Sequence, residues 1–239
     1  MNDVSLERLL QELSKFDTPT ICNALDFVIG KSNAGFTRSP VIAAQPHLPP
    51  VAGIVATARI RSHASTKITA EEYKNLRLEY YEYVARAPRP TVIIIQDLDD
   101  QPGLGGMWGE VTVALHKGLG VSAALTNGAM RDLDVLDPWF PLFAGSISVS
   151  HAFVHLVDFA VEVEVFGQKF SPGDLIHVDR HGGLKLPKDR IADLPAAVDL
   201  VMRKESPLLK AAKSPGFTIE MLKKALQDSE KEEMINVKN

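Results

Sequence analysis

The chain has 239 residues, 45% hydrophobic and 23% charged, enough to bury a substantial core without disulfides or a structural metal. Its formal net charge is −4 with both signs interspersed, and its apolar runs fall short of the roughly 18 residues of a membrane span, so we expect neither a nucleic-acid nor a membrane partner. A charged N-terminus without the apolar core of a signal peptide, and a single cysteine, Cys22, predict a cytoplasmic protein.

The first half of the chain alternates predicted helices and strands. Leucines at helical spacing predict an N-terminal helix over residues 4–15, and Asp17 or Thr18 followed by Pro19 predicts the start of another. Residues 30–50, rich in Gly, Ser, Pro and Asn, predict a loop. The apolar run TVIIIQ predicts a strand covered on both faces. The predicted strands are 53–61, 91–96 and 121–126, and the further helices are 69–86 and 109–117.

Beyond Pro138 the pattern changes to short strands and then to helices. Turn residues separate strands expected at 142–149, 159–166, 175–179 and 183–186. Residues 190–239 predict helices, interrupted around Pro207 and Pro215, with a polar tail. We therefore predict one domain over residues 1–239, an α/β core with an attached β layer and with flanking N- and C-terminal helices.

Two loops follow the strands at 91–96 and 121–126. If these strands are parallel neighbours, both loops lie at the same edge of the sheet, where ligands gather in open α/β folds. The first loop is rich in glycine and leads into a helix, whose first N–H groups are free to bind a carboxylate or a phosphate. A tight strand-to-helix turn is the alternative explanation of these glycines, and no Lys-Ser/Thr pair follows them as in a Walker loop.

The second loop places Arg131 beside Asp132. Arginine offers a planar, permanently charged fork for a carboxylate, and aspartate is a hard oxygen ligand that suits Mg²⁺. A lyase that forms an enolate needs both groups, one to hold the substrate carboxylate and one to carry a metal that polarises the adjacent keto oxygen. The alternative is a surface ion pair in which Asp132 caps a short helix that begins at Leu133.

The segment GEVTVALHKGLGVSAALTNGAMRDLDVL resembles the signature of the regulator of ribonuclease activity A-like family. This family includes the 4-hydroxy-4-methyl-2-oxoglutarate aldolases, which also decarboxylate oxaloacetate. The shared pattern is a Gly-acidic-apolar helix start, a helix that ends at glycine, an apolar strand, and Asn/Asp-Gly-x-x-Arg-Asp. Weaker similarity extends from DTPTICNALD through SPGDLIHVDRHGGLKLP to the closing helices. The resemblance implies a swivelling β/β/α-type fold, assembled into a homo-trimer or homo-hexamer with sites near subunit interfaces.

The resemblance also implies roles by position. Asp132 would anchor a divalent metal, Mg²⁺ or Mn²⁺, and Arg131 would bind the pyruvyl carboxylate of a small 2-oxo acid. Glu110 matches the acidic position behind the glycine and would hold a metal-bound water or assist proton transfer, although an acid favoured by the helix macrodipole is the alternative. The backbone amides that would complete the substrate cradle are those of Gly109, Glu110, Val111 and Thr112.

Two segments, SISVSHAFVHLVDF and DRHGG, depart from the family pattern. They contain His151, His155 and His181, a residue type suited to proton transfer near neutral pH. Satisfied core or surface histidines are the simpler explanation of each. These departures bear on the substrate more than on the metal site.

The sequence therefore predicts a metal-dependent carbon–carbon lyase that cleaves a small 2-oxo acid through a pyruvate enolate. Lys67 and Lys117 lie in no motif, so we expect no Schiff-base lysine. A non-catalytic, protein-binding regulator of a ribonuclease, a role also found in the family, is the main alternative. A metal-dependent hydrolase of acylpyruvates is a third.

Overall fold

The computed structural model describes residues 3–30 and 35–236. These residues divide into two compact units, one within Met1–Thr18 and Ala34–Lys188 and the other within Pro19–Asn33 and Asp189–Asn239. The prediction of one domain over the whole chain remains a prediction. No helix in the described ranges is both long and apolar enough to span a bilayer.

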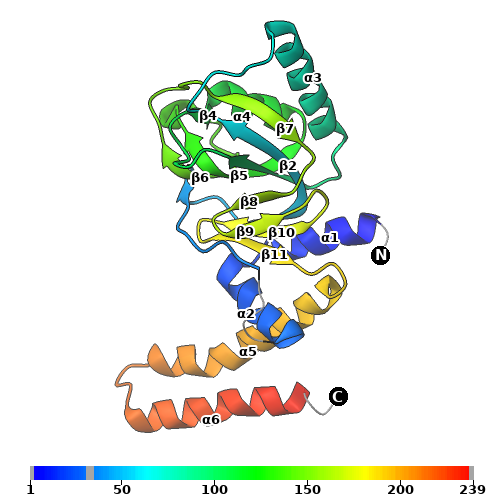
Figure 1. Ribbon diagram of the computed structural model, residues 1–239. Helices are drawn as coiled ribbons and strands as arrows, with labels where there is room; N and C mark the ends of the chain where they lie inside the picture. The colour runs from blue at the N-terminus through cyan, green and yellow to red at the C-terminus, as the bar shows by residue number, and fades with distance from the viewer. Residues whose placement is uncertain (1–2, 31–34, 237–239) are drawn as a thin grey trace. The chain divides into compact units, whose positions relative to one another are not determined.

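The larger unit contains every strand and three of the α-helices that the structure describes (Figure 1). The strands are β1 Ile42–Ala43, β2 Val51–Arg61, β3 Thr91–Asp97, β4 Gly106–Trp108, β5 Val121–Met130, β6 Leu142–Ile147, β7 His155–Phe159, β8 Val163–Val165, β9 Gln168–Phe170, β10 Leu175–Asp179 and β11 Gly182–Leu186. The helices are α1 Asp3–Leu13, α3 Ala70–Arg86 and α4 Glu110–Gly118, with a short 3₁₀ helix, η1, at Leu133–Val135.

The main sheet has the strand order β1-β6-β5-β3-β2-β10-β11, with β4 paired to β5 and β7 paired to β2. Its centre is parallel, because β2 pairs with β3, β3 with β5 and β5 with β6 in that sense. The strands β8 and β9 form a separate antiparallel pair. This curled sheet with helices confirms the predicted α/β fold of the swivelling type.

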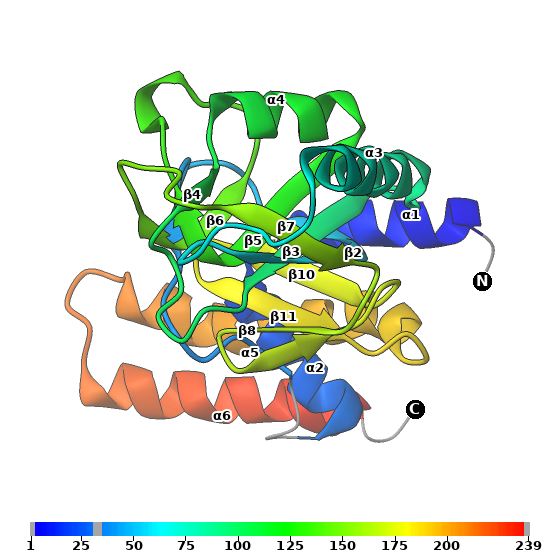
Figure 2. The same ribbon diagram turned by 45° about the horizontal axis from the view of Figure 1, so that its top comes forward.

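Side chains of β3 alternate between two cores, as expected for a strand covered on both faces. Ile93 and Ile95 belong to a core that includes residues of α3 and α4, and both helices lie over one face of the sheet (Figure 2). Val92 and Ile94 belong to a second core with residues of β8, β9 and β10. The continuous apolar run in the sequence is therefore explained by burial on both sides.

The helical unit contains α2 Thr18–Ile29, the 3₁₀ helix η2 Ile191–Asp193, α5 Leu194–Ala212 and α6 Ile219–Asn236. The helices α5 and α6 pack against each other, and Pro215 lies between them as predicted. The predicted interruption at Pro207 is wrong, because α5 continues through this residue. Packing of α5 against α6 offsets the hydrogen bond that a proline inside a helix removes.

The end of β5 differs from the prediction. A loop was expected after residue 126, where Asn127-Gly128 is a local turn signal, yet β5 continues to Met130 because β4 and β6 both pair with its last residues. The Asn127 side chain also bonds to the backbone of Asp97 on β3, accepting from its N–H at 2.7 Å and donating to its carbonyl at 3.0 Å. Tertiary pairing thus overrides a local turn signal. Three short strands, β1, β4 and β9, were not predicted, and the expected strand at 159–166 is divided between the end of β7 and β8.

Candidate active site

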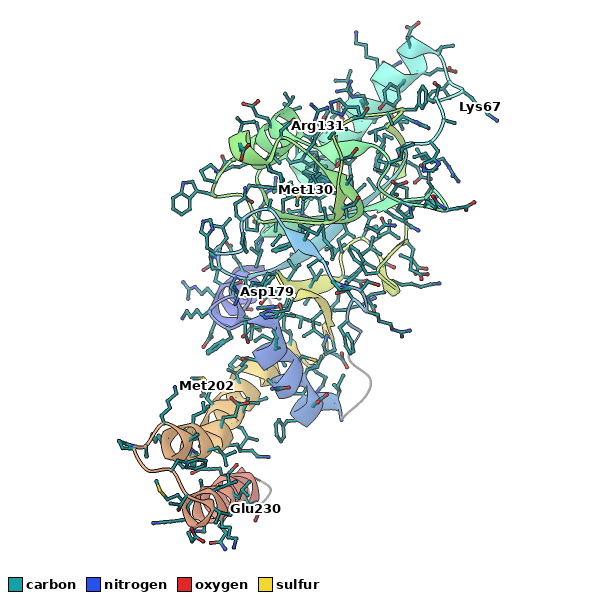
Figure 3. All side chains as sticks on the ribbon, turned by 90° about the vertical axis from the view of Figure 1, so that its left-hand side faces the viewer. Lys67, Met130, Arg131, Asp179, Met202 and Glu230 are labelled. Atoms are coloured by element: carbon teal, nitrogen blue, oxygen red, sulfur yellow. The ribbon has the colours of Figure 1, made fainter. Side chains whose placement is uncertain are left out.

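The parallel pairing of β3 with β5 brings the two candidate loops to the same edge of the sheet. Arg131 directly follows Met130, the last residue of β5 (Figure 3), and its N–H donates to the Trp108 carbonyl at 2.7 Å. Because Trp108 ends β4 and α4 begins two residues later, this bond holds Arg131 and Asp132 against the start of α4. The condition on which the shared edge depended, parallel pairing of these two strands, is therefore met.

Asp132 occupies the left-handed region, with φ 59° and ψ 36°. Non-glycine residues rarely adopt this conformation, although aspartate tolerates it better than most, and such outliers concentrate at functional sites. Asp132 lies at the N-cap position of η1, but its side chain makes no capping hydrogen bond. Instead Oδ1 accepts from Arg131 Nε at 2.9 Å and Oδ2 accepts from the Glu110 N–H at 3.3 Å. The carboxylate is therefore directed at the helix start and does not cap η1.

Hydrogen bonding by Arg131 holds the pKa of the Asp132 carboxyl below its usual value. The Glu110 N–H and the charges of Arg131 and His151 act in the same direction, while partial desolvation opposes them. Asp132 is therefore an anion at neutral pH, as a metal ligand must be.

Gly109 provides the space that the Asp132 carboxylate occupies. A Cβ at position 109 would lie 2.4 Å from Asp132 Oδ2 and 3.2 Å from Arg131 Cγ. A Cβ at Gly106 would meet the Arg131 side chain at 3.2 Å. The two glycines let the backbone of the loop approach the Arg131–Asp132 pair closely, which explains their position better than a tight turn alone.

The carboxylate of Asp132 fits a magnesium ion with few protein ligands. Mg²⁺ in proteins is commonly held by one or two carboxylates while it keeps several waters or takes substrate oxygens. Each Asp132 oxygen accepts one hydrogen bond and so retains acceptor capacity. Within the described residues no group of three or more His, Cys, Asp or Glu side chains converges, so a cage built wholly from such side chains is not expected there.

The start of α4 and the Arg131 guanidinium form an anion cradle. The first backbone bond within α4 runs from the Val113 N–H to the Gly109 carbonyl, so the N–H groups of Val111 and Thr112 precede it. The Glu110 N–H is already directed at Asp132, and the Glu110 side chain is exposed. Arg131 uses Nε for Asp132, and its Nη groups have no hydrogen-bond partner in the described part of the chain. These donors suit a small carboxylate.

His151 lies beside this cradle. Its Nδ1 is 2.9 Å from the Gly106 carbonyl, which only accepts, so Nδ1 carries the hydrogen and Nε2 of the neutral ring is an acceptor. The segment around His151 is held to the glycine loop by the Gly106 N–H, which donates to the Ser150 carbonyl at 2.8 Å, and by Ser148 Oγ, which donates to the Leu104 carbonyl at 2.8 Å. Ala152 has φ 45°, a second left-handed residue close to the site.

The other histidines and lysines considered from the sequence are surface residues or have local partners. His155 Nδ1 bonds to the Phe153 carbonyl, and His181 pairs with Asp179. Lys117 binds the Asp137 carboxylate at 2.6 Å, and Lys67, in the segment before α3, is exposed (Figure 3). The expectation that no Schiff-base lysine takes part stays a prediction.

One face of α3 carries residues near the candidate site that were not predicted from the sequence. Tyr73, Arg77 and Tyr81 follow one another at four-residue spacing and line a cavity of about 300 Å³ together with Met107, Thr112 and His151. The spacing places the three α3 residues on one side of the helix. That signal was present in the sequence, but nothing local showed that this side faces the candidate site.

A buried cluster supports α4 from within the larger unit. The Tyr80 hydroxyl donates to His116 Nε2 at 2.6 Å, and His116 Nδ1 donates to the Thr112 carbonyl at 2.7 Å. The Trp108 ring lies 4.7 Å from the His116 ring. Burial lowers the pKa of His116 to about 4, so this histidine is neutral and structural.

A second cavity of about 300 Å³ lies wholly within the helical unit. Its lining includes Phe27, Val201 and Leu208, with Lys204 over the Phe27 ring at 4.8 Å. None of the residues that the sequence predicted for the active site lines it.

Comparison with known proteins identifies relatives of the same fold. A family described as RraA-like, aldolase/RraA, matches residues 18–184, well over half of the chain. Among solved structures, an uncharacterized protein from Pseudomonas syringae pv. tomato is 22% identical with a TM-score of 0.68, covering 90% of this chain and 92% of that one. Streptomyces coelicolor RraAS2, an unusual member of the RNase ES inhibitor RraA protein family, is 18% identical with a TM-score of 0.63, covering 87% and 96%. No curated protein matches the chain.

Proposed function

The chain belongs to the RraA-like family, which includes both aldolases and ribonuclease inhibitors, and we propose that it is a divalent-metal-dependent lyase acting on a small 2-oxo acid. The observation that carries this proposal is the Arg131–Asp132 pair, placed against the start of α4 in space that Gly109 leaves open. The reaction would be retro-aldol cleavage of a 4-hydroxy-4-methyl-2-oxoglutarate-like acid or decarboxylation of oxaloacetate.

Arg131 would hold the pyruvyl carboxylate through its Nη groups, with the N–H groups of Val111 and Thr112 as further donors. When oxaloacetate is the substrate, the bond between its third and fourth carbons breaks and carbon dioxide leaves. The electron pair remains on the three-carbon fragment as pyruvate enolate, which takes one proton to become pyruvate. Negative charge that develops there is stabilised by the positive end of α4.

Asp132 would hold the divalent cation, Mg²⁺ or Mn²⁺, which when bound supplies Lewis-acid polarisation of the 2-oxo group. The Glu110 side chain, exposed in the first turn of α4, would pass a proton between solvent and the enolate. The exposure of Glu110 also agrees with the simpler role of an acid that favours the helix N-terminus.

The direct test is pyruvate release from oxaloacetate and from 4-hydroxy-4-methyl-2-oxoglutarate, measured with Mg²⁺ and with EDTA. The Asp132→Asn variant removes the charge, and asparagine tolerates the left-handed conformation that position 132 requires. Asp134→Asn is the matched control, because Asp134 is an exposed aspartate two residues away in η1. We expect release that needs both the metal and Asp132 and that survives Asp134→Asn.

Pyruvate release that persists in EDTA or in a folded Asp132→Asn variant would contradict the proposed metal site. Reduction with borohydride in the presence of substrate is a second check, since a trapped lysine adduct would mean that a Schiff base forms. The absence of release from both acids by the folded, Mg²⁺-loaded protein would remove the proposed activity on these substrates.

A protein-binding regulator of a ribonuclease is the rival function, since a solved structure of this fold comes from a protein described as an RNase ES inhibitor family member. Large apolar side chains are exposed on α4 and around η1, among them Val111 at 70%, Val135 at 57% and Trp139 at 73%. We propose that this surface forms the homo-trimer or homo-hexamer that the family resemblance implies. We expect sedimentation analysis to show a smaller assembly for Trp139→Ala than for the wild type. An unchanged assembly that loses binding to a ribonuclease would favour the rival function. A cytoplasmic location is part of the proposal.

A further inference from the structure

The cavity under α3 lies next to the proposed pyruvyl site. Its wall includes Thr112, two residues after the Glu110 N–H that donates to Asp132, and Met107, which follows the Gly106 that faces the Arg131 side chain. The cavity therefore begins where the anion cradle ends, around the first turn of α4.

His151 connects the cavity to the Asp132 carboxylate. It lines the cavity, bonds to the Gly106 carbonyl, and is near enough to Asp132 for its charge to help lower the pKa of that carboxyl. A substrate whose carboxylate is held at Arg131 would thus extend past His151 toward α3.

The far wall of the cavity offers donors for an anion. Arg77 is the one lining residue with a permanent charge, and in the described ranges neither it nor the Tyr81 hydroxyl has a hydrogen-bond partner. The neighbouring Tyr73 ring lies 5.9 Å from the Arg77 guanidinium carbon, and its hydroxyl accepts from the Leu156 N–H at 3.3 Å. Tyr73 is therefore fixed, while Arg77 and Tyr81 keep donors for a ligand.

The cavity is larger than is needed for the part of oxaloacetate that lies beyond its pyruvyl end. At roughly 30 Å³ per small group, the volume of one water in the liquid, its 300 Å³ holds about ten non-hydrogen atoms. The wall also includes the apolar side chains of Met107, Val154 and Leu156, against which an apolar middle part of the ligand can pack.

We propose that this cavity is the subsite for the distal half of the substrate, and that Arg77 with Tyr81 binds a second carboxylate at the end of an apolar arm. The preferred substrates are then extended 2-oxo dicarboxylic acids, and Arg77 is the residue that selects them. This inference rests on the proposed 2-oxo-acid site at Arg131 and Asp132, but it concerns binding and not bond cleavage.

The test uses pairs of non-cleavable acids that differ at the distal end, 2-oxoglutarate against 2-oxopentanoate and 2-oxoadipate against 2-oxohexanoate. Their dissociation constants are measured by calorimetry with the full chain and Mg²⁺. We expect the wild type to bind each diacid at least 10-fold more tightly than its partner, because a charge-assisted pair to arginine is strong. Arg77→Met should remove most of this preference and leave the dissociation constants of the monoacids within about threefold of the wild-type values. Tyr81→Phe should reduce the preference by less.

Lys74→Met is the matched control, because it removes one positive charge from the same exposed helix at a residue that does not line this cavity. Equal binding of diacids and monoacids by the wild type, or an equal loss in Lys74→Met, would overturn the subsite. Should pyruvate release fail while the Arg77-dependent preference persists, the proposed lyase activity falls and the subsite stands. Should release occur while Arg77→Met leaves the preference unchanged, the subsite alone falls.

Discussion

Two aspartates lie at the carboxyl ends of neighbouring parallel strands, yet they have opposite surroundings. Asp97 ends β3 with 1% of its surface exposed, and burial raises the pKa of its carboxyl despite hydrogen bonds from the Gly103 and Asp99 N–H groups. Asp132 follows β5 with its side chain 30% exposed, and Arg131 lowers its pKa. In the sequence, both are simply aspartates after an apolar strand.

The difference separates a carboxyl that supports the backbone from one for which we propose a catalytic role. Asp97 Oδ2 accepts from the Gly103 N–H at 2.8 Å and so fixes the beginning of the glycine loop. Asp132 touches the end of that loop through the Glu110 N–H. The buried carboxyl orders the backbone, and the exposed one is left ionised and open to a ligand.

The largest expected effect comes from replacing each aspartate by asparagine. Asp132→Asn should lower kcat/KM for pyruvate release about 1000-fold, the upper range for losing one electrostatic group in an active site, with little change in stability. Asp97→Asn should lower the free energy of unfolding by about 1–3 kcal/mol, because its amide cannot accept from both backbone donors. Urea unfolding and the pyruvate assay measure both variants.

This contrast between the two aspartates breaks down if the two variants lose activity and stability in parallel. A large loss of stability in Asp132→Asn would mean that its carboxylate supports the fold.

A pH experiment tests the contribution of the buried histidines to stability. His116 has a folded pKa of about 4 against an ordinary value of 6.5, so the unfolded chain binds a proton that the folded chain rejects. The contribution of His116 to the free energy of unfolding should therefore fall as the pH drops from about 6.5 to 4 and level off below that, by about 3.5 kcal/mol in all at 1.4 kcal/mol for each unit of pKa. His177, whose pKa burial also lowers, should add to the fall. Urea unfolding across this range measures it.

His116→Gln should flatten part of this pH dependence, whereas exposed His47→Gln should leave it unchanged. An unaltered slope in His116→Gln would show that His116 is not the source of the effect.

The smallest expected effect concerns the two glycines at the ends of α4. Gly109→Ala should lower kcat/KM about 10–100-fold, since its Cβ would displace the Asp132 carboxylate. The Cβ of Gly118→Ala would meet no atom within 4 Å, and position 118 is the last residue of α4, so the variant should keep its activity and gain less than about 1 kcal/mol in free energy of unfolding. Equal activity of the two variants would show that Gly109 does not shape the site.

The sequence alone predicted the α/β core and a β3 strand covered on both faces, because continuous apolar runs occur where both faces are buried. It placed Arg131 and Asp132 at one edge with the glycine loop only on the condition that the two preceding strands are parallel neighbours, and the structure meets that condition. These features are local in the chain, and residue spacing encodes them directly.

Other features were decided only by tertiary structure. The extension of β5 through Asn127 depends on pairing with β4 and β6, and the orientation of the Asp132 carboxylate depends on room left by Gly109. The cavity behind Arg77 forms where α3 meets the segment of His151, which is far from it in the chain. Contacts between distant segments leave no periodic signal in either segment, and only the folded chain shows which side chains face one another.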